Sequence, residues 1–539
     1  MNAKRMAAVG MLAAGSLLLS ATGLYAASAA ETAAAEKATI QMPGRLVYEV
    51  WTPAPWAHRN DGHWPQWWLV FDRLLENNAQ HIPEIPSLAT SWDISEDGLQ
   101  YTFHLRDDVV FHDGTPFSAH DVKATFLIIL DGYVTSPTWI GNLLNIEGVD
   151  AYRSGGADDI PGIEVADDHT VRFHLTTRTP GFLRNVSITS IMSKAQVELV
   201  GEGSKVEGHP TWSVPNGTGP FKVVETEPFQ FIRLEKHDAY HRGTPKIDEI
   251  IIHAKDPALA AANHEADFAF FQITPTSAKE IAKLDHMEVF AQVLNHLTAM
   301  SVNINRPELN DPRVRRALMM AIDRQTIADS LYGEYGDPIV PQGILPAIGW
   351  RNPNLTPVDF DPDGAIALLE EAGWDFGTTV TILLRDIDAG GIRLELATIV
   401  QDYWKEIGIA AEVELVEVAV IGTRLNEADF DFYMGGWSAV TPEALLRLRS
   451  DSPAQIGRGY SSPEVDRIAE QITTTYDMDE LRALYDQLQV HAWEDMVYMP
   501  VINTMGLMAR SSRLRTPGTI PDILNFPIDI SWHEWEVVQ

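Results

Sequence analysis

Apolar and polar residues alternate most clearly between Gln100 and Arg106, where every second residue from 101 to 105 is apolar. A period of two predicts a strand with one buried face. A preceding strand is predicted over Ser91–Ile94, and Gly98 between the two favours a tight turn. Ser118 is a suitable N-cap for a helix that begins near Ala119. This stretch therefore predicts two strands, a turn and a helix.

Weaker patterns flank this stretch in the first half of the chain. Arg45–Val50 predicts a first strand, and the residues from Trp67 to Leu75 predict an amphipathic helix. Ala266–Phe271 is short and apolar, which is typical of a strand covered on both faces. Further strands are predicted at Thr170–Leu175, Thr218–Glu225, Phe229–Glu235 and Asp248–His253.

Helical and strand patterns alternate from residue 298 to residue 498. Asp311 and Pro312 are a natural N-cap and first residue of a helix, and Gly373 is a natural helix end. Such alternation predicts a lobe in which helices cover a sheet. Its strands are predicted at Leu297–Asn303, Val380–Leu384, Ala411–Val416 and Met499–Leu507, and its helices at 312–322, 362–372, 394–407, 463–472 and from 479 onward.

The length of 539 residues exceeds what one hydrophobic core usually serves. We expect lobe I to contain residues 40–297 and 505–539, with residues 86–212 as an inserted subdomain. Residues 298–504 are expected to form lobe II. The chain then passes between the lobes twice, near 298–304 and 498–504, and these two strands predict a hinge.

The first 29 residues have the features of a cleaved signal peptide. Lys4 and Arg5 precede the apolar run Met6–Leu19, and Ala27 and Ala29 form an A-x-A cleavage site. The chain contains no cysteine, so we expect neither disulfides nor a lipid anchor. A periplasmic location follows as the expectation.

The formal net charge is −35, and it becomes −37 without residues 1–29, which carry only Lys4 and Arg5. Such a surface repels nucleic acid and anionic lipid, so neither is expected as a partner. The acidic residues are interspersed along the chain and do not form blocks, which indicates a solvated acidic surface.

Six sequence blocks, in order, resemble family 5 of the extracellular solute-binding proteins, the peptide, nickel and oligosaccharide receptors of bacterial ABC importers. The longest, Leu88–Phe126, reads LATSWDISEDGLQYTFHLRDDVVFHDGTPFSAHDVKATF. The others are NGTGPF at 216–221, VRRAL with AIDR between 314 and 324, the block 365–374, WKEIGI at 404–409 and MGGW at 434–437. The resemblance covers roughly residues 44–515.

This resemblance implies an α/β fold of the bilobal periplasmic binding protein class, type II, with an extra subdomain and a two-strand hinge. It implies a monomer that captures a peptide or similar oligomeric solute between its lobes and delivers it to an inner-membrane ABC permease. Ligand contacts made by both lobes stabilise the closed state. No catalysis and no cofactor are expected.

The resemblance also implies candidate ligand-binding residues. The loop after the first strand lines the cleft in the family, which points to Trp51 and Trp56. The MGGW block contributes Gly436 and Trp437. Peptide-binding members keep an aspartate for the α-ammonium shortly after this block, but residues 438–442 contain no acid, so Glu443 is the nearest candidate. Dipeptide receptors keep an arginine for the ligand carboxylate near Arg385, and Arg393 is its rival.

Two alternatives stay open. An aromatic-rich cleft without an ammonium clamp also suits an oligosaccharide, because flat rings cover the apolar face of a sugar. A secreted hydrolase is the alternative from another class, although the chain has no G-x-S-x-G, P-loop or dinucleotide motif. His58 and His63 are the only histidines near the expected cleft, and no HExxH occurs, so no metal site is expected.

Overall fold

The structure is a computed structural model that describes residues 37–43, 68–78, 82–131, 140–179, 181–200, 215–227, 230–269, 273–346, 350–388, 391–437, 442–452, 455–475, 477–517 and 531–538. The predicted signal peptide, the predicted strand Arg45–Val50 and the candidates Trp51 and Trp56 lie outside these described residues.

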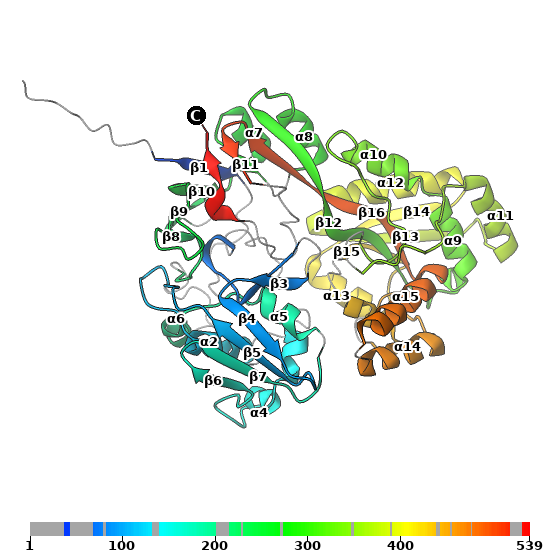
Figure 1. Cartoon of the computed structure of the whole chain (residues 1–539). Helices are drawn as coiled ribbons and strands as arrows, with labels where there is room; N and C mark the ends of the chain where they lie inside the picture. The colour runs from blue at the N-terminus through cyan, green and yellow to red at the C-terminus, as the bar shows by residue number, and fades with distance from the viewer. Residues whose placement is uncertain are drawn as a thin grey trace, which may run out of the picture. The chain divides into compact units, whose positions relative to one another are not determined.

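The first half of the chain builds two four-stranded sheets (Figure 1). One has the order β1-β10-β9-β8, with β1 parallel to β10 and the other pairs antiparallel. The other is antiparallel throughout, in the order β4-β5-β7-β6. The bounds are β1 Thr39–Pro43, β4 Ala89–Ile94, β5 Gln100–Leu105, β6 Ile163–Asp167, β7 Thr170–His174, β8 Phe221–Glu227, β9 Phe231–Lys236 and β10 Glu249–His253.

Helix α2 (Ala119–Ile129) packs against β6 and β7 and begins where the sequence predicts it. The backbone amide of Ser118 donates to Oδ2 of Asp121 over 2.8 Å, and this carboxylate forms the capping box of the helix. Phe126 of α2 meets Phe173 of β7 edge-on, with the ring centroids 4.9 Å apart. Among the described residues that follow α2, this half also contains the helices η1 Gly141–Asn145, α4 Val149–Arg153, α5 Phe182–Ile188 and α6 Lys194–Val200.

The predicted amphipathic helix from Trp67 does not extend to Leu75, so its predicted end is wrong. Among the described residues of this stretch, 68–70 are helical, and β2 (Leu75–Asn77) then pairs with β3 (Pro83–Pro86). Residues 69–71 are all fully buried, so this segment has no polar face for a surface helix to expose. Gly219 donates its amide hydrogen to the Val70 carbonyl, so the segment is enclosed by the NGTGPF turn.

The second half centres on a six-stranded mixed sheet in the order β11-β16-β12-β15-β13-β14. Strand β13 is parallel to β14 and β15, and the remaining pairs are antiparallel. Strand β12 begins ten residues before the predicted Leu297. The bounds are β11 Phe268–Ala269, β12 Met287–Val302, β13 Thr379–Arg385, β14 Ala410–Val416, β15 Phe432–Trp437 and β16 Tyr498–Ser511.

Helices alternate with these strands as the sequence predicts. Asp311, Asp361 and Ser462 cap α9, α11 and α14 through their side chains, and Gly373 ends α11 at φ 77°. The helices are α7 Pro257–Ala262, α8 Pro275–Ile281, η4 Pro307–Leu309, α9 Pro312–Met320, α10 Arg324–Tyr332, α11 Pro362–Ala372, η5 Asp386–Asp388, α12 Ile392–Glu406, α13 Val418–Asn426, η6 Pro442–Leu448, α14 Pro463–Thr474 and α15 Met478–Glu494, followed by β17 Leu514–Arg515, η7 Trp532–Glu534 and β18 Glu536–Val537.

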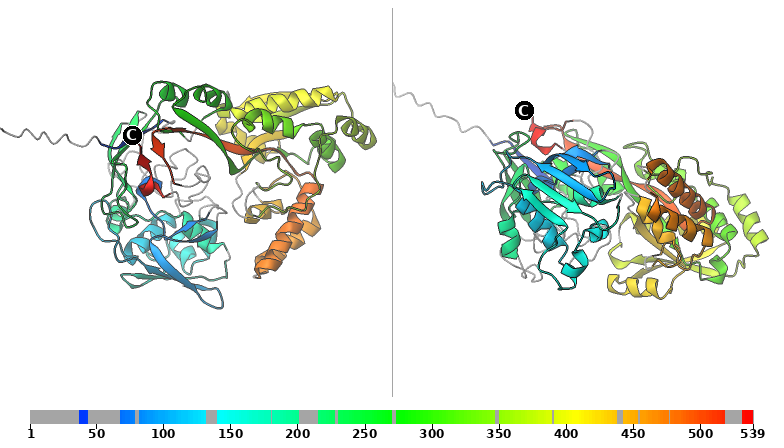
Figure 2. Two further views of the ribbon diagram at one scale, coloured as in Figure 1. Left: turned by 45° about the horizontal axis from the view of Figure 1, so that its top comes forward. Right: turned by 60° about the horizontal axis from the view of Figure 1, so that its bottom comes forward.

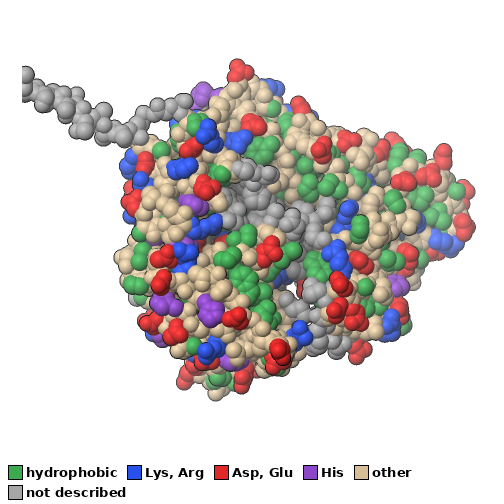
Figure 3. All heavy atoms as spheres, in the orientation of Figure 1, with side chains coloured by type: hydrophobic (Ala, Val, Ile, Leu, Met, Phe, Trp, Pro, Cys, Tyr) green, Lys and Arg blue, Asp and Glu red, His purple; other side chains and the backbone are tan. Residues whose placement is uncertain are grey.

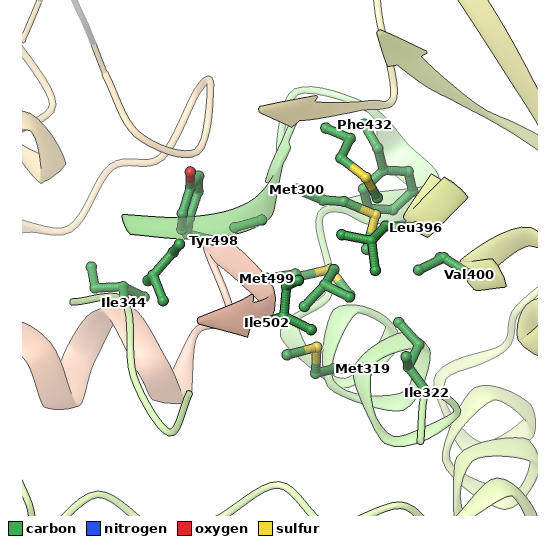
Figure 4. Close-up of a cluster of buried hydrophobic side chains, with 14 of the residues drawn as sticks. Met300, Met319, Ile322, Ile344, Leu396, Val400, Phe432, Tyr498, Met499 and Ile502 are labelled. Atoms are coloured by element: carbon green, nitrogen blue, oxygen red, sulfur yellow. The ribbon is translucent and has the colours of Figure 1, made fainter. Parts of the chain in front are cut away.

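Two large hydrophobic clusters form the interior. One gathers side chains of the two first-half sheets, and the other runs from α7 and α8 along β12 and β16 to the α/β layers. Figures 1 and 2 show β12 and β16 running side by side from α8 to β15. In the second cluster, Met300 and Phe432 meet Leu396 and Val400 of α12 (Figure 4).

The surface agrees with the composition. Asp and Glu side chains are scattered over the visible face and do not form one block (Figure 3). Within the described ranges, no helix combines the length and the apolar composition needed to cross a membrane.

Candidate functional site

The candidate residues gather where two parallel strands end. Ile382 and Leu383 of β13 pair with Phe432 and Tyr433 of β15, so both strands reach the same edge of the sheet. Arg385 is the last residue of β13, and Gly436 lies at the end of β15. Open α/β sheets bind their ligands at this edge.

Two arginines share one carboxylate at this edge. Arg385 donates from Nε to Oδ2 of Asp388 over 3.0 Å and from Nη2 to Oδ1 over 2.8 Å. Arg393, in the first turn of α12, donates from Nη1 to the same Oδ1 over 2.9 Å. Burial by itself would raise the pKa of Asp388, but its hydrogen bonds and ion pairs with Arg385 and Arg393 outweigh this effect and lower the pKa. Asp388 therefore stays ionised and holds both guanidinium groups in place.

The two arginines differ in which of their guanidinium nitrogens donate to Asp388 and which are left to bind a ligand. The Arg385 fork is bidentate on Asp388, whereas Arg393 uses Nη1 there. A Cβ built on Gly436 would lie only 2.5 Å from Nη2 of Arg393. Arg393 is thus the arginine that reaches the end of β15, and Arg385 orients it through Asp388.

His296 lies on the same glycine. A Cβ built on Gly436 would lie 2.3 Å from Cε1 and 2.4 Å from Nε2 of the imidazole. Only glycine leaves room for both groups. Burial, followed by the nearby charge of Arg393, lowers the pKa of His296 to about 3, so the imidazole is neutral at physiological pH.

Two tyrosines extend the site. Burial raises the pKa of Tyr433, although the charges of Arg385 and Arg393 oppose this rise. Burial also raises the pKa of Tyr498, which feels the charges of Arg447 and Arg393. Figure 4 shows the Tyr498 hydroxyl directed away from the hydrophobic cluster. Both phenols are neutral hydrogen-bonding groups beside the arginines.

Glu443 lies in η6, just beyond β15. Its Oε2 is buried and receives no hydrogen bond from any residue in the described ranges. Burial lowers the pKa of Arg184 from α5, and the charge of Glu443 opposes this effect. Burial raises the pKa of Tyr485, and the charge of Glu443 adds to the rise. A buried carboxylate oxygen without a donor is costly, and a cationic group would relieve that cost.

The structure brings together some of the residues named from the sequence. Arg385, Gly436 and Arg393 share one edge, and Glu443 lies in the next helix of the chain. Trp437 ends β15 opposite Leu297, but its side chain, like Trp51 and Trp56, is outside the described residues. No sequence pattern points to His296 or Asp388, because His296 reaches the site from a bulge in β12 and Asp388 from the short helix η5 after β13.

A metal site would depend on how the side chains that could ligate a metal are arranged in the described part of the chain. No cluster of three or more histidine, aspartate or glutamate side chains has a metal-binding arrangement there. His58 and His63 are outside the described residues.

Comparison with known proteins gives a consistent set of relatives. The family model for bacterial extracellular solute-binding proteins, family 5 Middle, matches residues 84–451. The glutathione-binding protein GsiB of Pectobacterium atrosepticum is 28% identical over 454 residues, which cover 81% of this chain and 84% of that protein. The oligopeptide-binding protein AppA of Bacillus subtilis is 26% identical over 437 residues, which cover 76% of this chain and 77% of that protein.

A solved structure agrees with the sequence relatives. The ABC transporter substrate-binding protein CtaP of Listeria monocytogenes superposes with a TM-score of 0.78 at 25% identity, covering 94% of this chain and all of that one. The predicted α/β fold of type II periplasmic binding proteins is thereby confirmed.

Proposed function

Because this chain belongs to family 5 of the bacterial extracellular solute-binding proteins, we propose that it captures a peptide and delivers it to an ABC permease. Its role as the solute-binding component of an importer comes from the family, and the peptide is our inference. The relatives that bind glutathione and oligopeptides support it.

The observation that carries the peptide assignment is the Arg393 guanidinium at the end of β15. Asp388 holds it through Nη1, and its Nη2 lies at Gly436. A planar, permanently charged fork of this kind suits the carboxylate of a peptide C-terminus. In this proposal Arg393 binds the carboxylate, while Arg385 acts indirectly through Asp388.

Glu443 is the proposed partner for the other end of the peptide. Its buried Oε2, which no described residue contacts by a hydrogen bond, suits an α-ammonium group. It would replace the aspartate that residues 438–442 lack. Trp437, Trp51 and Trp56 are proposed to supply apolar walls, and Gly436 to leave room for the ligand backbone.

Closure is the proposed mechanical step. Residues 40–297 with 505–539 would form lobe I, residues 298–504 lobe II, and β12 with β16 the hinge. A ligand that contacts both lobes stabilises the closed state by the difference between its contacts there and in the open state. The permease would then bind the faces of both closed lobes.

Location and partners follow from the same proposal. We infer that residues 1–29 are removed on export, that the mature chain acts as a monomer in the periplasm, and that it returns its solute unchanged. An oligosaccharide as the solute and a hydrolytic activity are outcomes that the experiment below distinguishes.

The test is a thermal-shift screen of refolded mature protein that carries no residual ligand. The probes are glutathione, tripeptide pools with both termini unmodified, the same pools amidated at the C-terminus or acetylated at the N-terminus, and an oligosaccharide panel. A probe at about 100 times its Kd adds roughly 2.7 kcal/mol to stability. We expect the unmodified peptides to raise Tm and each blocked form to raise it less.

The outcomes separate the alternatives. Stabilisation by oligosaccharides alone would refute the peptide assignment. Equal stabilisation by acid and amide forms would remove Arg393 from the proposed role, and equal stabilisation by amine and acetyl forms would remove Glu443. Mass spectrometry of the recovered probe tests hydrolysis, because a receptor returns it intact.

A further inference from the structure

Strand β12 contains a large bulge at the point where its neighbours change. Val293 pairs with Met505 and Leu297 with Asn503, so residues 294–296 lie opposite only residue 504 of β16. Before the bulge β12 pairs with β16 alone, and from Leu297 onward it also pairs with β15. A bulge breaks the regular ladder, and such features recur beside functional sites.

Polar side chains hold this bulge on the side of β16. The buried side-chain amide of Asn503 donates from Nδ2 to the Leu294 carbonyl over 2.8 Å. This bond gives the carbonyl a partner at the point where the bulge interrupts the pairing of β12 with β16. The hydroxyls of Thr298 and Thr504 lie 3.1 Å apart just beyond it. The bulge is therefore a defined conformation with its own hydrogen bonds.

His296 is the last residue of the bulge, and its imidazole leaves the strand toward the site. It lies over Gly436 beside the Arg393 guanidinium. Arg393 is in turn fixed by Asp388. One continuous line of contact thus joins the irregular point of β12 to the cation at the end of β15.

Resting on the proposed function, we propose that His296 is a positioning residue that couples ligand binding at Arg393 to the hinge through the bulge of β12. A ligand carboxylate bound to Arg393 fixes the guanidinium against His296. His296 is the last residue of the bulge, so fixing its ring also fixes the backbone of the bulge. In this proposal a filled site favours one conformation of the bulge. Ligand binding at this edge of the sheet thereby favours one hinge angle of β12 and β16, the strands that pass between the proposed lobes.

The imidazole suits this role because it is neutral. A cation at this position would repel Arg393, whereas a neutral ring packs against it and can exchange a hydrogen bond with the ligand or the backbone. Its contact with Gly436 is steric, so a side chain of similar length and polarity at 296 should preserve much of the coupling.

The test uses the mature chain with Thr244→Cys and Glu406→Cys, two exposed positions, labelled as a donor and acceptor pair. No native cysteine competes for the labels. The probes are glutathione and the tripeptide pools with unmodified termini, and the variants are His296→Ala, His296→Gln and the matched control His286→Ala. His286 stacks on His264 at the start of β12, away from the site.

Two quantities are measured with a bound probe, the Kd and the change in transfer efficiency at saturation. His296→Ala should raise Kd at least tenfold and reduce the transfer-efficiency change at saturation by at least half. His296→Gln should recover most of both, and His286→Ala should match the parent chain. A His296→Ala protein with full closure and a Kd within twofold of the parent would overturn the proposal.

A third measurement needs no ligand. Hydrogen exchange of residues 293–298 should be at least fivefold faster in His296→Ala than in the parent, with the remainder of the chain unchanged. If no probe binds the parent chain, the proposed function fails, and this comparison then tests separately whether His296 holds the bulge. Equal exchange rates in the two proteins would overturn it.

Discussion

At the residue scale, the site depends on small differences in how charges and rings are packed. Arg385 and Arg393 lie eight residues apart and meet the same carboxylate, and Nη2 of Arg393 is among the three atoms nearest to a Cβ built on Gly436. Gly436 matters because it has no Cβ, and a Cβ there would collide with His296 and Arg393. The identity of a residue in this site is therefore set by what its neighbours leave room for.

The first prediction concerns that space. Gly436→Ala places a methyl group within 2.3–2.5 Å of His296 and Arg393, so one of the two must move. We expect ligand affinity to fall about tenfold or more, equivalent to at least ~1.4 kcal/mol, and overpacking to cost about 1–3 kcal/mol of stability. Titration calorimetry and urea unfolding measure the two effects.

Gly422→Ala is the matched control for this substitution. Gly422 lies in α13, and an added Cβ would meet nothing within 4 Å. Alanine there should stabilise the helix by roughly 0.5–1 kcal/mol and leave binding unchanged. Equal effects at both glycines would contradict the steric explanation.

The second prediction concerns acid stability. The pKa of His296 is lowered to about 3, chiefly by burial, and that of His112 to about 4 for the same reason, whereas both titrate near 6.5 when unfolded. Below pH 6.5 the unfolded chain therefore binds more protons, and stability falls with pH. Each histidine contributes up to about 1.4 kcal/mol per pH unit until its folded pKa is reached.

Urea unfolding of the parent and of His296→Gln between pH 7 and pH 4.5 tests this slope. The variant should lose less stability over that window, because glutamine takes up no proton. His104, an exposed residue paired with Asp93, serves as the control position. Parallel pH profiles for the parent and His296→Gln would rule out a neutral buried imidazole at 296.

At the element scale, the resembling sequence blocks serve mainly to hold the scaffold. The carboxylate of Asp121 accepts from the Ser118 amide and hydroxyl and, through Oδ1, from the Lys194 amide over 2.7 Å. It thus fixes the start of α2 and the start of α6 together. His112 has the same type of role, since its ring bonds to the Gly217 amide and the Gly219 carbonyl.

The third prediction follows from Asp121. Asp121→Ala removes the carboxylate half of the capping box, which leaves the Ser118 and Lys194 amides without this acceptor, so we expect a loss of about 2 kcal/mol. Asp363→Ala, an exposed aspartate in the first turn of α11, should cost only a few tenths of that amount. Denaturant midpoints measure both, and similar losses would refute the double-capping role.

At the scale of the whole molecule, long strands connect distant parts of the chain. β12 and β16 pair from Met287 with Ser511 to Ser301 with Tyr498, and they join α8 at one end to β15 at the other. Any closing motion of the proposed lobes must bend or twist this pair. The bulge at residues 294–296 is the point on it with the fewest ladder bonds.

The fourth prediction tests that motion by stapling the pair. Thr298 and Thr504 have hydroxyl oxygens 3.1 Å apart, so Thr298→Cys with Thr504→Cys places two sulfurs within reach of a bond. The oxidised protein should bind its ligand at least tenfold more weakly than the reduced one, because the staple restricts the bulge. Reduction should restore affinity, and equal affinity in both redox states would place the hinge elsewhere.

The sequence by itself determined the elements and the family. Capping residues such as Asp311 and Gly373, and the periods of two and 3.6, act within a few residues of the chain, so they predict strands and helices correctly for most of the second half. The ordered sequence blocks identified the family and its type II fold, which the comparisons confirm. Local rules failed where burial on every side removed the periodic pattern, as at residues 69–71.

Only the tertiary structure decided the composition of the site. Nothing near His296 in the sequence distinguishes it, because its position depends on a bulge that the pairing with Asn503 and Met505 creates. The choice between Arg385 and Arg393 likewise depends on Asp388 and on the space above Gly436. These contacts join residues from five separate elements, β12, β13, η5, α12 and β15, and the geometry between elements is a property of packing that no local pattern records.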